Sequence, residues 1–300
     1  MGRIVVIGST NTDMVVKSKK IPAPGETIIG GTFFMNPGGK GANQAVAAAR
    51  LNGKVTLVTK TGNDYFSEQA KHIFDFEGIE TKYIVNDPRN PSGIALIMVD
   101  QDGENCIVVA PGSNGTLSAY DIDDEVYGDD PSDVFLMQLE IPVSTVEFVA
   151  ERVSSRGNRV ILNPAPAKQL SNELLKCLYV ITPNEFEAEM LTGIKVTDAS
   201  SAEKCAEKLK SRGPQNVIIT MGAAGAYLLA ENISRIIPVV PVRALDTTAA
   251  GDVFNGALAV AISEGRNLGE AVRFANTAAA ISVTRMGAQS SAPYRKEINL

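Results

Sequence analysis

Short apolar runs rich in β-branched residues recur along this chain of 300 residues and are separated by helical patterns. Each run is apolar throughout rather than alternating, which is typical of strands buried on both faces of a parallel sheet. The clearest runs lie at 3–8, 54–60, 133–139, 159–163 and 216–222, and the clearest helical stripes lie at 41–53, 144–157 and 201–213. Their alternation predicts an α/β fold with a parallel sheet covered by helices on both faces.

Two segments, 14–36 and 81–110, break this alternation. They contain short apolar pieces separated by polar turns such as Asp102-Gly103, without a helical stripe, and this predicts antiparallel strands. We expect the two segments to meet as a small sheet inserted into a single domain that spans residues 1–300. Such a sheet would form a lid over a site at the carboxyl ends of the parallel strands. Two unrelated hairpins remain the alternative.

The charge balance and the cysteine content disfavour several classes of protein. Lys and Arg total 28 against 34 for Asp and Glu, a net charge of -6 without a basic block, so nucleic-acid binding through a cationic face is disfavoured. No window approaches the ~18 apolar residues of a membrane span, and the first residues lack a secretory signal. Cys106, Cys177 and Cys205 are too far apart for a disulfide framework or a CxxC metal site, so we expect a reduced, cytoplasmic setting.

The chain has a single histidine, His72, within a helical pattern at 64–78. A histidine-based triad, or a zinc site built from several imidazoles, is therefore close to excluded. Any chemistry must be carried by carboxylates, amides, lysine and backbone N–H groups.

The string DTTAAGDVFNGALAVAI at 246–262 is the most specific in the chain. Its helical spacing predicts a helix that begins near Gly251, with the backbone N–H groups of Ala249, Ala250 and Gly251 forming an anion site at its start. Asp252 would stand beside that site, ionised, as a base next to a phosphoryl group. The alternative is that Asp252 only complements the helix dipole, as first-turn acids commonly do.

A second glycine-rich string, NPGGKGANQAVAAA, lies at 36–49. It is not a Walker A loop, because Lys40 is followed by Gly41 rather than Ser or Thr. Its glycines would allow close approach of the backbone to a ligand, with Lys40 and Asn43 as side-chain donors. A tight turn before a core helix explains the same residues.

Polar side chains follow two of the predicted strands. Asn11 and Asp13 stand where a dinucleotide-binding fingerprint would need glycines, and they suit hydroxyl groups instead, although turn chemistry also favours them. Glu140 follows the run at 133–139, where α/β sheets place residues that contact ligands; a solvated loop acid is the alternative.

Two further strings follow predicted strands. In ITPNEFEAEMLTG, Asn184 and Glu187 could organise the water shell of a Mg²⁺ ion bound to phosphates, or they could simply cap a helix. TMGAAGA at 220–226 could be a hairpin turn or a nucleotide contact.

Six strings taken in order resemble the ribokinases of the pfkB carbohydrate kinase family: GSTNTD, NPGGKGANQA, NPAPA, TPNEFEAEMLTG, TMGAAGA and DTTAAGDVFNGAL. The likeness runs over nearly the whole chain, and six ordered coincidences are far less probable than one. The resemblance implies a ribokinase-like, mostly parallel sheet flanked by helices in three layers, with a small β lid that also forms a homodimer contact. It implies transfer of the ATP γ-phosphate to the 5-hydroxyl of D-ribose. Another pfkB kinase acting on a different sugar or a nucleoside is the main alternative, and a sugar sensor without catalysis is disfavoured by the AAGD string.

The resemblance also implies roles for the matching residues. Asp252 would be the catalytic base, with Ala249, Ala250 and Gly251 as the anion hole. The sugar would be held by Asn11, Asp13, Gly39, Lys40, Asn43, Glu140 and Asp252. The nucleotide and Mg²⁺ would be served by Asn184, Glu187, Thr220, Gly222, Gly225, Gly251 and Asn276. A monovalent cation, usually K⁺, would lie among Asp246, Thr248, Ser282, Arg285, Gly287 and Ser291, mostly bound by backbone carbonyls.

Overall fold

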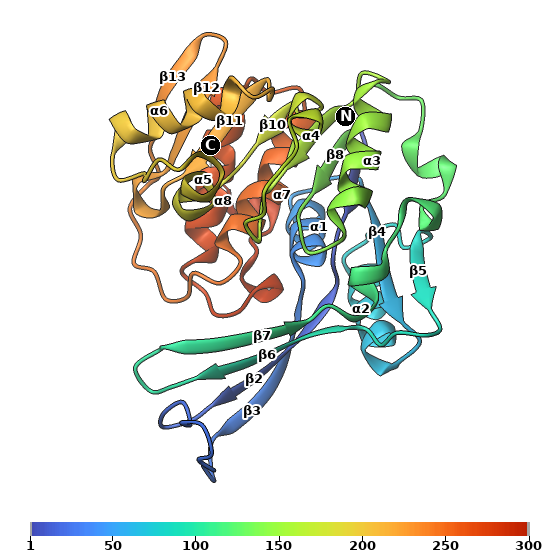
Figure 1. Cartoon of the computed structure of the whole chain (residues 1–300), viewed down its shortest axis with the longest axis vertical. Coiled ribbons are helices and arrows are strands. Elements are labelled where there is room, and N and C mark those ends of the chain that lie inside the picture. Colours follow the sequence, from blue (N-terminus) through green and yellow to red (C-terminus); the bar gives the residue numbers. More distant parts are fainter. Residues whose placement is uncertain (1, 299–300) are drawn as a thin grey trace.

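The apolar runs form the centre of a nine-stranded sheet in the computed structural model, which describes residues 2–298. The strand order is β13-β12-β11-β10-β9-β8-β1-β4-β5 (Figure 1). The bounds are β1 Ile4–Ile7, β4 Val55–Gly62, β5 Ile84–Asp87, β8 Val134–Met137, β9 Arg159–Leu162, β10 Val180–Ile181, β11 Asn216–Thr220, β12 Ala226–Ala230 and β13 Ile233–Ile237. All neighbouring pairs from β5 to β11 are parallel, and the two pairs β11–β12 and β12–β13 are antiparallel.

Helices cover both faces of this sheet. Their bounds are α1 Lys40–Arg50, α2 Tyr65–Phe76, α3 Val143–Ser154, α4 Asn172–Lys176, α5 Glu185–Thr192, α6 Ala199–Lys210, α7 Ala250–Ser263 and α8 Leu268–Ser282. Alternate residues of β1 face opposite sides: Ile4 and Val6 pack in a core with α1, α7 and α8, whereas Val5 and Ile7 pack in a second core with α3 and α6. Both faces are therefore apolar, which confirms the predicted three-layer, mostly parallel architecture.

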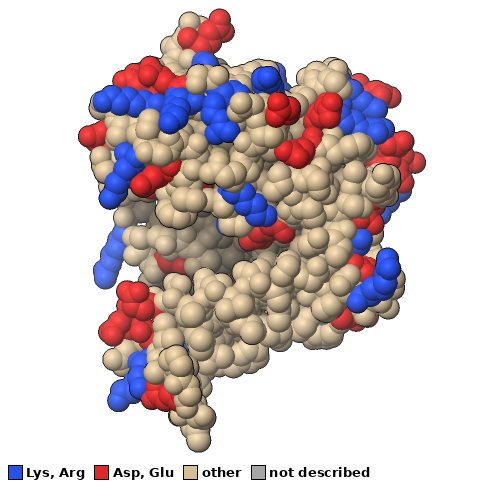
Figure 2. All heavy atoms as spheres, in the orientation of Figure 1, with Lys and Arg blue, Asp and Glu red and all other residues tan. Residues whose placement is uncertain are grey.

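The two segments that break the alternation contribute a separate four-stranded sheet, in the order β3-β2-β6-β7. Its strands are β2 Asn11–Lys17, β3 Thr32–Gly38, β6 Gly93–Val99 and β7 Asn105–Ala110. In Figure 1 this sheet extends below the main body, and Figure 2 shows a hollow between the two.

Two expectations for these segments were wrong. β2 and β6 pair in parallel, with Asn11 opposite Gly93, because both strands leave the main body in the same direction; only the two outer pairs are antiparallel. The start of the segment 81–110 does not join the small sheet. It forms β5, which pairs in parallel with β4 after the crossover through α2.

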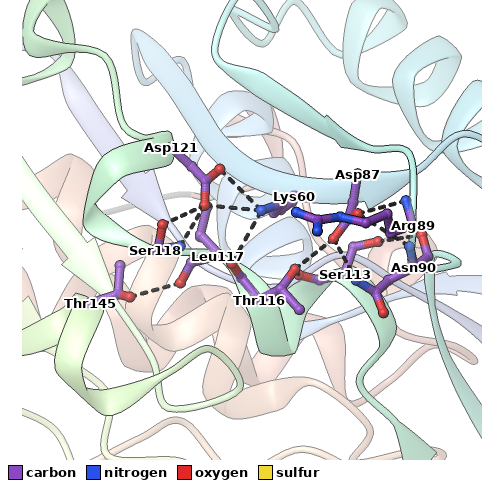
Figure 3. A network of polar contacts seen from close by, with 10 residues as sticks. All are labelled: Lys60, Asp87, Arg89, Asn90, Ser113, Thr116, Leu117, Ser118, Asp121 and Thr145. Carbon is purple, nitrogen blue, oxygen red and sulfur yellow. Dashed lines mark hydrogen bonds and ion pairs between the residues drawn. The ribbon is translucent and has the colours of Figure 1, made fainter.

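A polar network ties the small sheet to the edge of the large one (Figure 3). The carboxylate of Asp87, at the end of β5, accepts hydrogen bonds from the Asn90 side chain at 2.9 Å and from Thr116 Oγ1 at 2.7 Å. Lys60 of β4 donates to the Thr116 carbonyl at 3.2 Å and to both oxygens of Asp121 at 3.0 Å. The residues that precede β6 and follow β7 are therefore joined to each other and to the main sheet.

No helix in the part of the chain covered by residues 2–298 is long and apolar enough to cross a membrane.

Candidate active site

Asp252, in the first turn of α7, is buried beneath the start of α1. Its Oδ2 accepts a hydrogen bond from Asn43 Nδ2 at 3.0 Å, and its Oδ1 accepts one from Gln44 Nε2 at 3.0 Å. The side chain is only 4% exposed. A carboxylate that merely complemented the helix dipole would face solvent, so the burial and the two amide donors favour a site.

The electrostatics around Asp252 differ from the sequence expectation of an ordinary ionised carboxylate. Burial raises its pKa, and the charge of Lys40 together with the hydrogen bonds from Asn43 and Gln44 opposes that rise. The pKa of Lys40 is also raised, because the charge of Asp252 favours the ammonium more than burial disfavours it. The lysine therefore stays positively charged close to a carboxylate that binds a proton more readily than usual.

The start of α7 offers backbone donors, but not the three that were expected. Ala249 caps the helix in the left-handed region with φ of 58°, and the N–H of Ala250 already donates to the carbonyl of Thr247 at 3.2 Å. Within residues 2–298, the N–H groups of Ala249 and Gly251 make no hydrogen bond. Apart from its chain neighbours and the backbone of its own helix, no heavy atom of the described residues lies within 4 Å of the position that a Cβ on Gly251 would occupy, so space remains beside these donors.

Close backbone contact joins the start of α1 to the end of β1. A Cβ on Gly41 would lie 2.6 Å from the backbone of Gly8 and Ser9, so only glycine fits there. Glu140 completes this junction, since its Oε2 accepts hydrogen bonds from Ser9 Oγ and, at 3.0 Å, from the Lys40 N–H. Glu140 is therefore a fixed residue of the site rather than a solvated loop acid.

Asn11 and Asp13 lie on β2, where this strand leaves the main sheet. Asn11 Oδ1 accepts a hydrogen bond at 2.8 Å from Asn114, which also pairs with the backbone of Thr10, so the amide of Asn11 is held in place. Burial, followed by the charges of Glu140 and Asp252, raises the pKa of Asp13 to about 6. These groups are thus brought together with Lys40 and Asp252, as predicted from the sequence.

Two further site residues adjoin this group. Gly39 has φ of 88°, and a Cβ there would lie 2.7 Å from the Asn11 nitrogen. The Oδ1 of Asn43 is buried and has no hydrogen-bond partner within residues 2–298. Because a buried acceptor without a donor is costly, this atom favours a ligand that brings a hydroxyl group.

On the other side of Asp252, a cavity of about 180 Å³ lies between α5 and α7. Its wall includes Lys40, Asn184, Glu187, Thr220 and the start of α7. Asn184 caps α5 by accepting from the Glu187 N–H at 2.8 Å, and Glu187 Oε2 accepts from the Asn184 N–H at 3.0 Å. The capping interpretation therefore holds, while burial raises the pKa of Glu187, which faces the same cavity.

The residues expected to contact the nucleotide include Gly222, Gly225 and Asn276, which lie near β12 and β13. The string TMGAAGA turns the chain between β11 and β12, with Gly222 at φ of 49° and Gly225 at φ of 97°. A Cβ on Gly225 would meet the Ile237 carbonyl at 2.2 Å. Asn276 is buried on α8 and donates from its side chain to the same carbonyl at 2.8 Å. Gly225 and Asn276 thus serve the packing of the β12–β13 edge, whereas a Cβ on Gly222 would meet no atom within 4 Å outside its chain neighbours.

The predicted cation residues come from two loops that the fold brings together. The carboxylate of Asp246 accepts from the Thr248 N–H at 2.9 Å and from the Gly287 N–H at 2.8 Å. These hydrogen bonds outweigh burial and lower the pKa of Asp246. The side chain of Arg285 pairs with Glu297, and the hydroxyl of Ser291 donates to the Ala288 carbonyl. The hydroxyl of Ser282 donates to the Ala279 carbonyl at 2.8 Å, and its own carbonyl accepts from the Arg285 N–H.

Sequence reasoning missed four polar residues in and around the site: Gln44, Asn114, Gln138 and Asn163. Gln44 lies in the string NPGGKGANQA and Asn163 in NPAPA, so the sequence singled out both positions but assigned neither residue a role. Gln138 and Asn114 carried none, because each is a single amide whose partner lies about a hundred residues away (94 and 103 positions, respectively).

Comparison with known proteins places the whole chain in one family. Residues 1–295 match the family described as pfkB family carbohydrate kinase. The chain is 46% identical over 294 residues to a ribokinase of Haemophilus influenzae, with 98% of this chain and 96% of that protein covered. A ribokinase structure from Thermotoga maritima has a TM-score of 0.92 at 42% identity, covering 99% and 98% of the two chains. An Arabidopsis thaliana ribokinase complexed with ribose and ATP has a TM-score of 0.91 at 32% identity, covering 99% and 97%.

Proposed function

The chain belongs to the pfkB family of carbohydrate kinases, and on that premise we propose that it phosphorylates D-ribose at the 5-hydroxyl group with ATP. The observation that carries this proposal is the position of Asp252. It lies between the hydroxyl-binding groups of β2 and α1 and the cavity at the starts of α5 and α7. A base in that position can touch both an alcohol and a phosphoryl group.

The reaction needs one proton transfer and one phosphoryl transfer. Asp252 accepts the proton of the 5-hydroxyl while the sugar oxygen bonds to the γ-phosphorus and the bond to the ADP oxygen breaks. The raised pKa of Asp252 supports this role, because a base is most effective when its pKa approaches the working pH. The unpartnered N–H groups of Ala249 and Gly251 would stabilise the charge on the transferring group.

Recognition of the sugar is assigned to donors and acceptors around Lys40. Asp13 and Asn43 Oδ1 offer acceptors to hydroxyl groups, and Lys40 and Asn11 offer donors. Gly39 allows the start of α1 to approach β2 closely beside the sugar-binding groups, since a side chain there would strike the backbone of β2. Glu140 contributes mainly by fixing the backbone at the start of α1.

The residues present fit two inorganic partners. Asn184 and Glu187 would hold the water shell of Mg²⁺, which would offset the phosphate charges. The backbone carbonyls around Asp246, Thr248, Ser282, Arg285, Gly287 and Ser291 would hold K⁺, which would add positive charge behind the start of α7. Asp246 supports this assignment, because its lowered pKa keeps it negatively charged. Asn184, Thr220, Gly222, Gly225 and Asn276 would shape the nucleotide side of the site.

We assign two roles to the small sheet: a lid over the sugar and the contact of a homodimer. Both are supported by its exposed apolar residues, among them Phe33 at 58%, Leu96 at 50% and Val108 at 63% exposed. We place the enzyme in the cytoplasm, where ATP and reduced thiols are found.

An assay of ADP release tests the proposed reaction. Turnover is measured with ribose, fructose, 2-keto-3-deoxygluconate and adenosine, each with and without K⁺. We expect the highest kcat/KM with ribose, and the product identified as ribose 5-phosphate. A higher value for another acceptor would assign the chain to a different pfkB kinase, and ribose binding without any ADP release would indicate a sensor.

A further inference from the structure

A chain of buried side-chain amides adjoins Asp252, and one of its members, Asn163, also lines the cavity. Gln44 Nε2 donates to Asp252 Oδ1 at 3.0 Å and to Asn163 Oδ1 at 3.1 Å. Gln44 Oε1 accepts from Gln138 Nε2 at 2.6 Å. Gln44 and Gln138 are fully buried and Asn163 is 6% exposed, so bulk water does not compete for these bonds.

The orientation of each amide in this chain follows from its neighbour. An ionised Asp252 can only accept, so Gln44 must turn its NH₂ group towards it. The carbonyl of Gln44 then points the other way and needs a donor, which Gln138 supplies. Asn163 is fixed independently, because its own NH₂ group donates to the Thr182 carbonyl at 3.3 Å and leaves its oxygen to accept from Gln44.

The far end of the chain is held by packing. A Cβ on Gly8 would lie 2.1 Å from Gln138 Oε1, so Gln138 fills the space beside this glycine. That oxygen has no hydrogen-bond partner within residues 2–298. The oxygen of Gln138 is therefore left without a donor while its NH₂ group bonds to Gln44. This arrangement indicates that the orientation of the amides matters.

A proton on Oδ1 of Asp252 would require the chain to reverse. This oxygen would then donate to Gln44 Oε1, so Gln44 would have to turn over and present its NH₂ group to Gln138. Asn163 Oδ1 would then lose its donor, and Asn163 could not follow, because turning over would set its oxygen against the Thr182 carbonyl. The amide chain is therefore complete only when Oδ1 of Asp252 carries no proton, which leaves Oδ2, beside Asn43, as the oxygen that accepts one.

We propose that Gln44, held in one orientation by Gln138 and Asn163, is a positioning residue that keeps Asp252 in its proton-accepting form and aimed at the sugar. This inference rests on the proposed function, in which Asp252 is the base. It also gives a role to two of the strings that mark the sequence, since Gln44 ends the GGKGANQ string and Asn163 begins NPAPA. Gln44 itself does not contact the sugar in this assignment.

The ionised state of Asp252 is also influenced by charged groups on other elements. Lys40 on α1 favours it, while Glu140 after β8, Asp13 on β2 and Glu187 on α5 oppose it. None of these four groups hydrogen-bonds to Gln44 or Gln138 in the described part of the chain. Substituting the two glutamines therefore tests the amide chain while leaving the surrounding charges in place.

The test compares Gln44→Met and Gln138→Met with the unmodified enzyme. Methionine has a similar length and no hydrogen-bonding amide. For Gln44→Met we expect kcat to fall by about 10- to 100-fold, KM for ribose to stay within about threefold, and the acidic limb of the kcat–pH profile to move up by about one pH unit. Gln138→Met should shift the same limb in the same direction by a smaller amount, and the double variant should resemble Gln44→Met alone.

Asn216→Leu is the matched control. Asn216 is a buried amide that donates to the Tyr179 carbonyl at 3.0 Å, at the opposite end of the sheet, so its loss should lower the melting temperature without moving the acidic limb. An unmodified enzyme that does not turn over ribose would refute the proposed function. An unmodified enzyme that does, with an unmoved acidic limb in both glutamine variants, would refute the positioning role. If Gln44→Met does not fold, Gln138→Met decides by the same criterion.

Discussion

Replacing Asp252 with asparagine removes the proposed base while preserving the size and shape of the side chain. General-base catalysis contributes about 10²- to 10⁴-fold to a rate, or about 3 to 5.5 kcal/mol of barrier. We therefore expect kcat for ribose phosphorylation to fall by that factor in Asp252→Asn. The larger value is favoured here, because among the residues that the structure describes no other carboxylate hydrogen-bonds to Asn43 or Gln44 and could take its place.

The same substitution should change folding and sugar binding much less. An asparagine keeps one acceptor, so either the Asn43 or the Gln44 hydrogen bond is lost, at a cost of about 1.5 to 3 kcal/mol for a bond to a charged group. Removing a buried charge offsets that cost, since burial disfavours the ionised form. We expect melting temperatures within a few degrees of each other, and a loss in ribose affinity of no more than about tenfold.

Three measurements decide the matter: ADP release by a coupled assay, ribose binding by calorimetry and thermal unfolding. Turnover within about tenfold of the unmodified enzyme would refute the assignment of Asp252 as base. A parallel loss of ribose binding and turnover would instead make it a binding residue.

Four other outcomes follow from the same contacts. Asp13→Asn should raise the free energy of unfolding by about 3 kcal/mol at pH 7, and this gain should shrink towards about pH 4. The pKa of Asp13 rises from 3.8 to about 6 on folding, so its charge opposes folding increasingly as the pH rises through that interval. Chemical denaturation at the two pH values measures the difference. Gly41→Ala should lower stability by about 1 to 3 kcal/mol in the same experiment, since its Cβ would overlap the backbone of β1. Saturating ribose should slow hydrogen exchange at 14–36 and 81–110 if the small sheet closes over the sugar, and unchanged exchange would remove the lid proposal. Asp246→Ala should increase the K⁺ concentration needed for half-maximal activity, whereas an unchanged K⁺ response would place the cation elsewhere.

The large sheet was predictable because its strands are buried on both faces. Ile4 to Ile7 are apolar at every position and fully buried, so the sequence pattern reports the environment directly. The small sheet was harder to predict. Its strands lie at the surface, and β7 is exposed along its whole length, so the pattern could indicate strands but not which of them pair in parallel.

The site was predictable where residue type alone limits the chemistry. Asp252, Lys40 and Asn43 stand in strings whose glycines and small residues already indicate close backbone approach. The occupied N–H of Ala250 could not be foreseen, because it depends on how the loop before α7 folds back to Thr247. Nor could the amides behind Asp252, since Gln44 meets Asp252 across 208 positions of sequence.

The small sheet is attached to the main body at one end only, and its other end projects freely (Figure 1). β2 and β3 meet at Asn11 and Gly38 beside the pocket, and their other ends, Lys17 and Thr32, form the seventh pair along the two strands. Changes at the free tip, between Lys17 and Thr32, therefore need not disturb the register at the root. A fluorophore or a short epitope could be inserted there to report the motion of the sheet while the sugar contacts stay intact.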